Sequence, residues 1–327
     1  VKRELDEMIG LQAVKEKVLR LEAKARALRR KLAEGASEIP EETLHLVFTG
    51  RPGTGKTTVA RLVARFFHAL GLLPRTEVKE VTASTLMSSN VGETRENMHK
   101  AVSEAIGGVL FIDEAPQFGE SGDHQAKEAV QALVPMAWNH RSELVIILAG
   151  YAEKMIDFFK MDEGLPRRFP PHGQIEFPDY SLPELWEILL RVLRKRSLSL
   201  DPACGPRLRA LLDRRRRRGD FGNAGGVENL VSEIVENHLR GPDPDSTTIG
   251  LDDLPPLVRR DPAALARATA LLDRMVGLGP VRQRLDALRV RIEFGLQEEA
   301  AGEGSGSLNV HPGNMRFVGP PGTGKTT

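Results

Sequence analysis

The stretch LHLVFTGRPGTGKTT, residues 44–58, decides the fold of this chain. Residues 44–49 are mostly apolar and predict a short buried strand. Residues 50–58 fit the pattern GxxxxGK(S/T), in which glycines allow backbone N–H groups to wrap around phosphate oxygens. Apolar residues then recur at helical spacing over residues 59–70. Strand, loop and helix therefore follow one another as a phosphate-binding loop requires, with the positive end of the helix dipole toward the phosphate.

The loop carries the residue types that nucleotide chemistry needs. Lys56 would bring a positive charge to the outer phosphates, and the hydroxyl of Thr57 would be a ligand of magnesium. The sequence therefore predicts a site for ATP and Mg²⁺. The predicted nucleotide-binding residues of this loop are Pro52, Gly53, Thr54, Gly55, Lys56, Thr57 and Thr58.

A second motif, GGVLFIDE at residues 107–114, places two carboxylates directly after an apolar strand. Because parallel strands end at one edge of a sheet, these carboxylates should lie beside the phosphate loop. We predict that Asp113 holds magnesium, directly or through water, and that Glu114 and Lys56 are catalytic, with Glu114 as the general base toward water. The alternative is a strand followed by a solvated acidic turn, but the position after a phosphate loop favours the catalytic interpretation.

The chain also contains a long internal repeat. Residues 5–11 (LDEMIGL) return as residues 272–278 (LDRMVGL), at an offset of 267, and the phosphate loop returns as GPPGTGKTT at residues 319–327. This pattern indicates a duplicated domain rather than a solenoid. We expect the chain to be cut from a longer protein, with an incomplete second unit. The second loop predicts further nucleotide-binding residues: Gly322, Gly324, Lys325 and Thr326.

Hydrophobic patterns predict an α/β fold for the first unit. An apolar stripe at helical spacing over residues 11–32 predicts a long first helix. Short apolar strands between helices predict a parallel five-stranded sheet sandwiched by helices, followed by a small helical lid. The strands after the first are expected at residues 78–82, 109–113, 144–149 and 174–177. The predicted parts are residues 1–179 (nucleotide-binding domain), 180–240 (helical lid), 241–262 (linker) and 263–327 (start of a second unit).

Composition narrows the function classes. A net charge of +1 gives no global electrostatic reason to bind nucleic acid or an anionic membrane. The longest apolar runs, 109–112 and 144–150, are too short to span a bilayer. Cys204 is the only cysteine, which fits a reducing cytoplasm, and we expect it to be a small buried or half-buried thiol. The arginine run at residues 214–218 lacks interleaved aromatic residues, so we expect a solvated helix face rather than a nucleic-acid site.

Several stretches together resemble the CbbX/CfxQ group of AAA+ ATPases, which includes the sporulation protein SpoVK and the type VII secretion ATPase EccA. These stretches are residues 44–50, 107–115, 144–151, 177–180 (FPDY) and 221–224 (FGNA). The resemblance covers residues 5–239 and begins again at residue 272, as in a tandem member truncated in its second AAA+ unit. It implies an ATP-hydrolysing, homo-oligomeric ring, usually a hexamer, that binds nucleotide at subunit interfaces and remodels protein clients through a central pore.

The resemblance also assigns roles to individual residues. Ile9 and Gly10 match the linker that faces adenine in the family, although packing at a helix entry is the alternative. Arg168 stands where the family has its catalytic arginine finger, which reaches the γ-phosphate of the neighbouring subunit. A surface arginine is the alternative for Arg168, and Arg167 could exchange roles with it.

The sequence departs from the family at three positions. Gly225 replaces an arginine of the lid that would contact the γ-phosphate, and Asn90 replaces an aromatic residue of the pore loop. Tyr151 occupies a slot that holds a polar, water-positioning residue in many AAA+ proteins, though tyrosine is common in this group. An aromatic ring binds an extended chain through a large, rigid contact area, and an amide cannot do so. The departures therefore leave an alternative function open. That alternative is a nucleotide-gated assembly scaffold with weak or no hydrolysis. A nucleic-acid motor is a third hypothesis, supported only by the arginine run.

Overall fold

A computed structural model gives the fold of the chain as two compact units. The first unit holds residues 1–195 and 215–232, and the second holds residues 196–214 and 233–327. The structure describes residues 1–33, 43–88, 90, 92–120, 124–217, 219–256, 267, 269–270, 274 and 279–301. The second phosphate loop, with Gly322, Gly324, Lys325 and Thr326, lies outside the described residues, so its nucleotide site stays a prediction.

The first unit is built on one parallel sheet of five strands. In spatial order β2-β3-β4-β1-β5, every neighbouring pair is parallel. The strands are β1 (Leu46–Gly50), β2 (Val78–Thr82), β3 (Val109–Asp113), β4 (Val145–Gly150) and β5 (Gln174–Phe177). The prediction of a parallel five-stranded sheet is confirmed, with strand ends within two residues of those expected.

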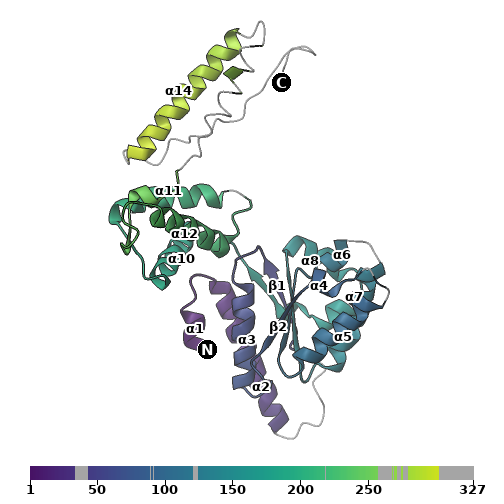
Figure 1. Ribbon diagram of the computed structural model, residues 1–327. Coiled ribbons are helices and arrows are strands. Elements are labelled where there is room, and N and C mark those ends of the chain that lie inside the picture. The colour runs from purple at the N-terminus through teal and green to yellow at the C-terminus, as the bar shows by residue number, and fades with distance from the viewer. Residues whose placement is uncertain are drawn as a thin grey trace. The chain divides into compact units, whose positions relative to one another are not determined.

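Helices cover both faces of this sheet (Figure 1). Helices α2 and α3 pack on one face, while α5 and α7 pack on the other. The α-helices that lie wholly in this unit are α1 (Lys2–Asp6), α2 (Gln12–Ala33), α3 (Lys56–Ala69), α4 (Ala83–Leu86), α5 (Glu93–Ala105), α6 (Gln117–Glu120), α7 (His124–Asn139), α8 (Ala152–Phe159), α9 (Gly164–Arg168) and α10 (Leu182–Lys195), with a short 3₁₀ helix η1 (Pro171–Gly173) before β5.

Alternating side chains of the strands explain the two covered faces. Val47, Ile112 and Leu148 share an apolar cluster with side chains of α5, α7 and α9. Their neighbours Phe48 and Phe111 point to the opposite face, because successive side chains of a strand alternate. All of these residues are buried, as expected for central parallel strands enclosed on both sides.

The second unit contains a small two-stranded sheet and several helices. Strands β6 (Ser199–Leu200) and β7 (Thr248–Ile249) pair in parallel. The strand β7 and a 3₁₀ helix η3 (Leu251–Asp253) lie inside the segment predicted as a linker, and Ile249 is buried there. Helix α11 (Gly205–Arg216) begins in this unit after the 3₁₀ helix η2 (Pro202–Cys204), and α12 (Asn223–Leu239) ends in it.

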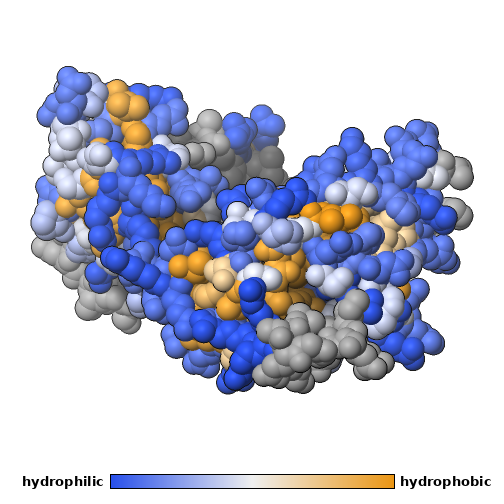
Figure 2. Space-filling model, turned by 90° about the horizontal axis from the view of Figure 1, so that it is seen from below, coloured by the Kyte–Doolittle hydropathy of each residue, from blue (hydrophilic) through white to orange (hydrophobic). Residues whose placement is uncertain are grey.

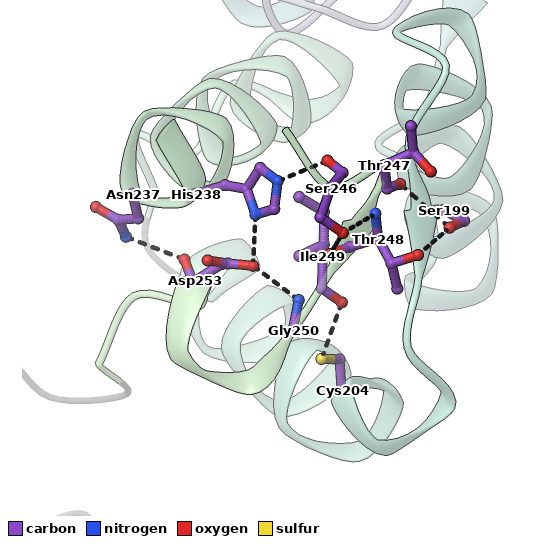
Figure 3. Close-up of polar contacts among 10 residues, drawn as sticks. All are labelled: Ser199, Cys204, Asn237, His238, Ser246, Thr247, Thr248, Ile249, Gly250 and Asp253. Atoms are coloured by element: carbon purple, nitrogen blue, oxygen red, sulfur yellow. Dashed lines mark hydrogen bonds and ion pairs between the residues drawn. The ribbon is translucent and has the colours of Figure 1, made fainter. Parts of the chain in front are cut away.

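Polar contacts hold the second unit together around one buried histidine (Figure 3). His238 of α12 bonds Asp253 of η3 and the backbone of Ser246. Cys204 is buried as predicted, with its thiol directed at the carbonyl of Ile249 at 3.6 Å.

A long helix follows in the duplicated part of the sequence. Helix α14 (Gly279–Ala301) begins 267 residues after α2 begins at Gln12, which is the offset of the sequence repeat. The helix therefore stands where a duplication would place a second copy of α2. The domain boundaries drawn from the sequence nevertheless stay predictions.

One face of the molecule is largely polar (Figure 2). On the face drawn in Figure 2, hydrophilic residues predominate and apolar residues reach the surface in patches among them. Within the ranges that the structure describes, every helix is too short or too polar to cross a membrane.

Candidate nucleotide-binding site

The phosphate loop joins β1 to α3 through glycines that no other residue can replace without strain. Gly53 (φ 70°) and Gly55 (φ 94°) both adopt the left-handed conformation. A Cβ atom added to Gly53 would lie 2.1 Å from the carbonyl oxygen of Gly222, and one added to Gly50 would lie 2.4 Å from that of Phe177. The loop therefore packs backbone against backbone, which leaves its N–H groups at the start of α3 to face a ligand.

Lys56 begins α3 and turns back toward its own loop. Its side chain is buried, and Nζ donates hydrogen bonds to the carbonyl oxygens of Gly50 (2.8 Å) and Arg51 (2.9 Å). Burial lowers the pKa of Lys56, while the nearby carboxylate of Asp113 raises it. The ammonium group is thus held beside the loop, where an entering phosphate would offer it a fully charged acceptor.

The acidic pair lies at the end of β3. The carboxylate of Asp113 accepts a hydrogen bond from the backbone N–H of Glu114 at 2.9 Å. Glu114 has a positive φ of 54°, which is uncommon for a non-glycine residue and turns the chain sharply. Its exposed carboxylate accepts a hydrogen bond from Nε2 of Gln117 at 2.8 Å. Sequence reasoning missed Gln117, because no motif or spacing singles it out.

One cavity of about 140 Å³ brings these groups together. Lys56, Asp113 and Glu114 all line it, along with Gln117 and Tyr151. The sheet topology explains why these side chains lie together, because β1, β4 and β3 are parallel neighbours and end at the same edge. The structure therefore joins the three side chains that carry the predicted chemistry.

The donor set fits a nucleotide with magnesium. Asp113 supplies carboxylate oxygens, and Thr57 lies half-buried in the first turn of α3, next to Lys56. Oxygen ligands from one or two side chains, completed by phosphates, are what Mg²⁺ usually takes in proteins. Among the described residues, no group of three or more His, Cys, Asp or Glu side chains is arranged to hold a metal by itself.

A polar tether joins the phosphate loop to the start of α12. Asn223 donates from Nδ2 to Oδ1 of Asp179 (2.8 Å) and to the carbonyl oxygen of Pro52 (3.3 Å). Its Oδ1 accepts a hydrogen bond from the N–H of Tyr180 (3.0 Å). The next residue, Ala224, donates its N–H to the carbonyl oxygen of Gly53 at 3.1 Å. The sequence motifs FPDY and FGNA contain these residues, but sequence reasoning used them only as family markers.

Tyr180 adds a second contact to the same loop. Its hydroxyl donates to the carbonyl oxygen of Thr54 at 3.4 Å, and burial raises the pKa of Tyr180 to about 12. The phenol therefore stays protonated and can remain a donor throughout the physiological pH range.

A larger cavity of about 550 Å³ adjoins the first. The two share Pro52 and Tyr151. Its lining residues are Arg51, Pro52, Tyr151, Asp179, Tyr180, Arg216, Arg217, Gly219, Asp220, Phe221, Gly222 and Asn223.

Ile9 and Gly10, the predicted adenine contacts, lie close to the phosphate loop without lining either cavity. Their neighbours Met8 and Leu11 come within 3.7 and 3.6 Å of a Cβ atom built on Gly55. Ile9 is buried and Gly10 has a φ of 60°. Adenine contact by Ile9 and Gly10 therefore stays a prediction.

Arg168 lies at the end of α9 and lines neither cavity. Its guanidinium stacks 5.0 Å from the ring centroid of Trp138, and Arg141 lies 4.0 Å from the same ring. The Nε atom of Arg168 is buried without a hydrogen-bond partner among the described residues. The arginine is thus half-buried and oriented by stacking, and its role as a finger toward another subunit stays a prediction.

Two of the three departures from the family pattern, Asn90 and Gly225, have different surroundings. Asn90 donates from Nδ2 to the carboxylate of Glu93 at 2.6 Å, and Ser88 donates to the same oxygen. The amide is therefore bonded at the start of α5. A Cβ atom on Gly225 would meet nothing within 4 Å, so the missing lid arginine leaves open space.

Known protein families match both parts of this arrangement. The model described as "ATPase family associated with various cellular activities (AAA)" matches residues 46–176, and the model "AAA lid domain" matches residues 181–264. Protein CbbX of Cereibacter sphaeroides is 39% identical over 235 residues, which cover 71% of this chain and 75% of CbbX. The chain belongs to the CbbX/CfxQ group of AAA+ ATPases. The predicted family is confirmed, and membership makes the chain an ATP-binding ATPase.

Two further similarities agree with this assignment. The chloroplastic ribulose bisphosphate carboxylase/oxygenase activase of Cyanidioschyzon merolae is 36% identical over 229 residues, covering 69% of this chain and 76% of the activase. The crystal structure of the FIGL-1 AAA domain in complex with ADP superposes with a TM-score of 0.51 and 21% identity, covering 81% of this chain and 88% of that domain. At this identity, the structural likeness to FIGL-1 shows the AAA+ fold alone.

Proposed function

We propose that this chain is an ATP-driven remodeller of protein clients that works as a homo-oligomeric ring. The observation that carries the proposal is the single cavity lined by Lys56, Asp113 and Glu114 at the edge of the sheet. The relative named as an activase of ribulose bisphosphate carboxylase/oxygenase supports a protein as the client, because its name describes action on another enzyme.

The proposed mechanism gives each residue one task. Lys56 contacts the outer phosphates and offsets their charge, while Thr57 and Asp113 hold Mg²⁺, which neutralises phosphate charge when bound. Glu114 accepts a proton from the water that attacks the γ-phosphorus. The bond from that phosphorus to the bridging oxygen of ADP breaks, so ADP and inorganic phosphate leave. Arg168 of a neighbouring subunit stabilises the charge that spreads over the γ-phosphate oxygens.

Phosphate release with Mg-ATP tests this function. The wild-type protein should release phosphate, and Glu114→Gln should abolish release while ATP stays bound, since the amide keeps the shape of the side chain but cannot accept the proton. Glu153→Gln is a matched control, because Glu153 is an exposed acid on α8 outside the cavity. Equal turnover by wild type and Glu114→Gln would end the proposal.

A second candidate is a nucleotide-gated scaffold that assembles and hydrolyses little. Gly225 and Asn90 favour it, because one removes a cation from the lid and the other removes an aromatic grip from the pore loop. Turnover near background together with ATP-dependent oligomers in light scattering would select the scaffold. Rapid turnover that a protein client stimulates would select the remodeller.

A further inference from the structure

The Arg168 side chain is held by an aromatic ring rather than by an acid. Its guanidinium carbon lies 5.0 Å from the centroid of the Trp138 ring, within the range of a cation–π contact. Its Nε atom is buried without a hydrogen-bond partner, and among the described residues no carboxylate forms an ion pair with this arginine. The ring of Trp138 is therefore the contact that restrains the orientation of the guanidinium.

The backbone of Arg168 is fixed by separate contacts. Thr43, which is buried just before β1, donates from Oγ1 to the carbonyl oxygen of Arg168 at 2.6 Å. The next residue, Phe169, is also buried, and its ring lies 5.4 Å from the ring of His45. These two anchors hold the end of α9 beside the start of β1. The rotatable bonds of the Arg168 side chain are what remains to be restrained, and only the side chain's own packing can do this.

Trp138 is well placed to restrain them, because its own ring is held at the end of α7. The residue is half-buried, and the guanidinium of Arg141 lies 4.0 Å from the centroid of its ring. Arg141 also donates from Nη1 to the carbonyl oxygen of Trp138 at 2.8 Å, so it binds both the backbone and the ring of the same residue. Arg141 therefore restrains the ring by contacts that do not depend on Arg168.

The neighbouring Arg167 lacks this support. Its side chain is exposed, whereas Arg168 is half-buried, and no aromatic ring among the described residues forms a cation–π contact with Arg167. An exposed arginine loses rotamer freedom when it meets a phosphate, but a stacked arginine has lost part of that freedom in advance. The stacking therefore favours Arg168 over Arg167 as the arginine that acts on a phosphate.

We propose that Trp138 is a positioning residue for ATP hydrolysis, whose ring holds the guanidinium of Arg168 ready for the nucleotide of a neighbouring subunit. The inference rests on the proposed function, in which Arg168 stabilises the charge on the γ-phosphate of that nucleotide. Trp138 lines neither cavity of its own subunit, so it acts through Arg168. A cation that is already oriented needs no reorganisation as the charge develops, which raises kcat rather than the affinity for ATP.

The turnover of two variants of Trp138 tests this inference. Leucine keeps an apolar side chain but has no π face, whereas phenylalanine keeps a π face. Trp138→Leu should lower kcat about tenfold with little change in KM for ATP, and Trp138→Phe should retain most of the wild-type kcat. Trp186→Leu is the matched control, since Trp186 is a half-buried tryptophan of α10 that lines neither cavity. Equal kcat values for wild type and Trp138→Leu, or equal losses for the two Trp138 variants, would overturn the inference.

Two further measurements separate positioning from a structural effect of Trp138. In the Arg168→Ala background, Trp138→Leu should lower the single-turnover rate no further, because the ring acts through the arginine alone. Mixing Trp138→Leu with Lys56→Ala should raise turnover, since the Lys56→Ala subunits still carry both Trp138 and Arg168. A further tenfold loss in the Arg168→Ala background, or no gain on mixing, would show that Trp138 supports its own site and would overturn the inference.

Failure of the inference and failure of the proposed function give different results. If wild type hydrolyses ATP and Trp138→Leu does so equally well, the inference alone fails. If wild type releases no phosphate from Mg-ATP, or if Glu114→Gln matches it, the proposed function fails and the inference fails with it.

Discussion

The side-chain amide of Asn223 donates a hydrogen bond to the carboxylate of Asp179 at 2.8 Å. The same side chain reaches Pro52 in the phosphate loop and accepts a bond from Tyr180 after β5. One residue at the start of α12 therefore fixes two segments that lie far from it in the sequence. Any shift of α12 must move the phosphate loop or break these bonds, which couples the lid helix to the nucleotide site.

Removing the Asn223 amide should weaken both stability and nucleotide binding. Asn223→Ala leaves a carboxylate, a carbonyl and an N–H group of the tether without this partner, at a cost of about 2 kcal/mol or more. The midpoint of thermal unfolding should fall by about 5 °C or more. ATP affinity should fall as well, because the loop loses its anchor.

Two comparisons separate the tether from other effects of this substitution. Asn223 has a positive φ of 51°, so Asn223→Gly removes the amide without adding backbone strain. Asn97→Ala is the matched control, since it removes a single bond to the carbonyl of Leu86 at 3.3 Å and Asn97 lines neither cavity. If Asn97→Ala lowers ATP affinity as much as Asn223→Gly does, the tether has no special role.

Sequence patterns predicted the sheet well because its strands are governed by local rules. Continuous apolar runs between helices mark buried parallel strands, and the glycine pattern of residues 50–58 marks the turn from β1 into α3. The meeting of Lys56 with Asp113 and Glu114 was also predictable, since parallel strands end at one edge of the sheet.

The tether and the second cavity could not be predicted in this way. Asn223 contacts Asp179 across 44 residues of sequence, and no periodicity or spacing specifies such a contact. The arginine run reads as a solvated face until the fold places Arg216 and Arg217 on a cavity wall. Strand β7 has only two residues, so no pattern marks it inside a segment rich in Pro, Asp and Gly.

Gln117 should act as a positioning residue for Glu114. Its Nε2 donates to the Glu114 carboxylate at 2.8 Å, which restrains a side chain that is otherwise exposed. Gln117→Ala should lower kcat by about tenfold with little change in KM, because ground-state binding of ATP does not use this bond. A loss that appears in KM while kcat is unchanged would contradict the positioning role.

Arg168 should act on the nucleotide of a neighbouring subunit, since it lines neither cavity of its own. Arg168→Ala should retain ATP binding and lose about 10³-fold or more of the hydrolysis rate. Mixing Arg168→Ala with Lys56→Ala should restore activity. In mixed oligomers, the Arg168→Ala subunit provides an intact nucleotide site and the neighbouring Lys56→Ala subunit provides an intact Arg168. Phosphate release from the mixture measures this directly. If Arg167→Ala shows this behaviour and Arg168→Ala does not, the two arginines have exchanged roles.

His45 should make the first unit sensitive to mild acid. Its Nδ1 accepts a hydrogen bond from the N–H of Ile146 at 3.0 Å, and its Nε2 faces the carbonyl of Ala137 at 2.7 Å, so the neutral ring fits both partners. Burial lowers the pKa of His45 from 6.5 to about 4, despite the opposing effect of the Ala137 carbonyl. The unfolded chain therefore binds the proton more readily, and stability is lost as the pH falls from about 6.5 toward 4.

The effect is large enough to measure as a change in the free energy of unfolding with pH. A pKa lowered from 6.5 to about 4 corresponds to about 3 kcal/mol at the acid end of this range. The free energy of unfolding, measured with urea at several pH values in this range, should decline more for wild type than for His45→Gln, whose amide does not titrate. Parallel declines in the two proteins would show that other groups control acid unfolding.

His238 should give the second unit the opposite pH dependence. Its Nδ1 lies 2.9 Å from the Asp253 carboxylate and its Nε2 lies 2.9 Å from the Ser246 carbonyl (Figure 3). Both partners are acceptors, so only the doubly protonated ring satisfies both contacts. The Ser246 carbonyl and the Asp253 carboxylate raise the pKa of His238, with a further contribution from Asp243.

The sign of this effect follows from the raised pKa of His238. Stability from the charged ring is complete below the ordinary value of 6.5 and is lost as the pH rises through the higher folded pKa. The N–H of Gly250 donates to the same Asp253 carboxylate at 2.7 Å. Hydrogen exchange of this amide, corrected for the pH dependence of the intrinsic exchange rate, therefore measures the local stability of the segment. In wild type, the protection factor of the Gly250 amide should fall as the pH rises through the folded pKa of His238. In His238→Gln, which has no titrating ring, the protection factor should be lower at acid pH and should not change with pH. Protection that instead increases with pH in wild type would show that the ring is neutral in the folded protein, and the segment would then depend on the Asp253 contacts to Gly250 and Asn237 alone.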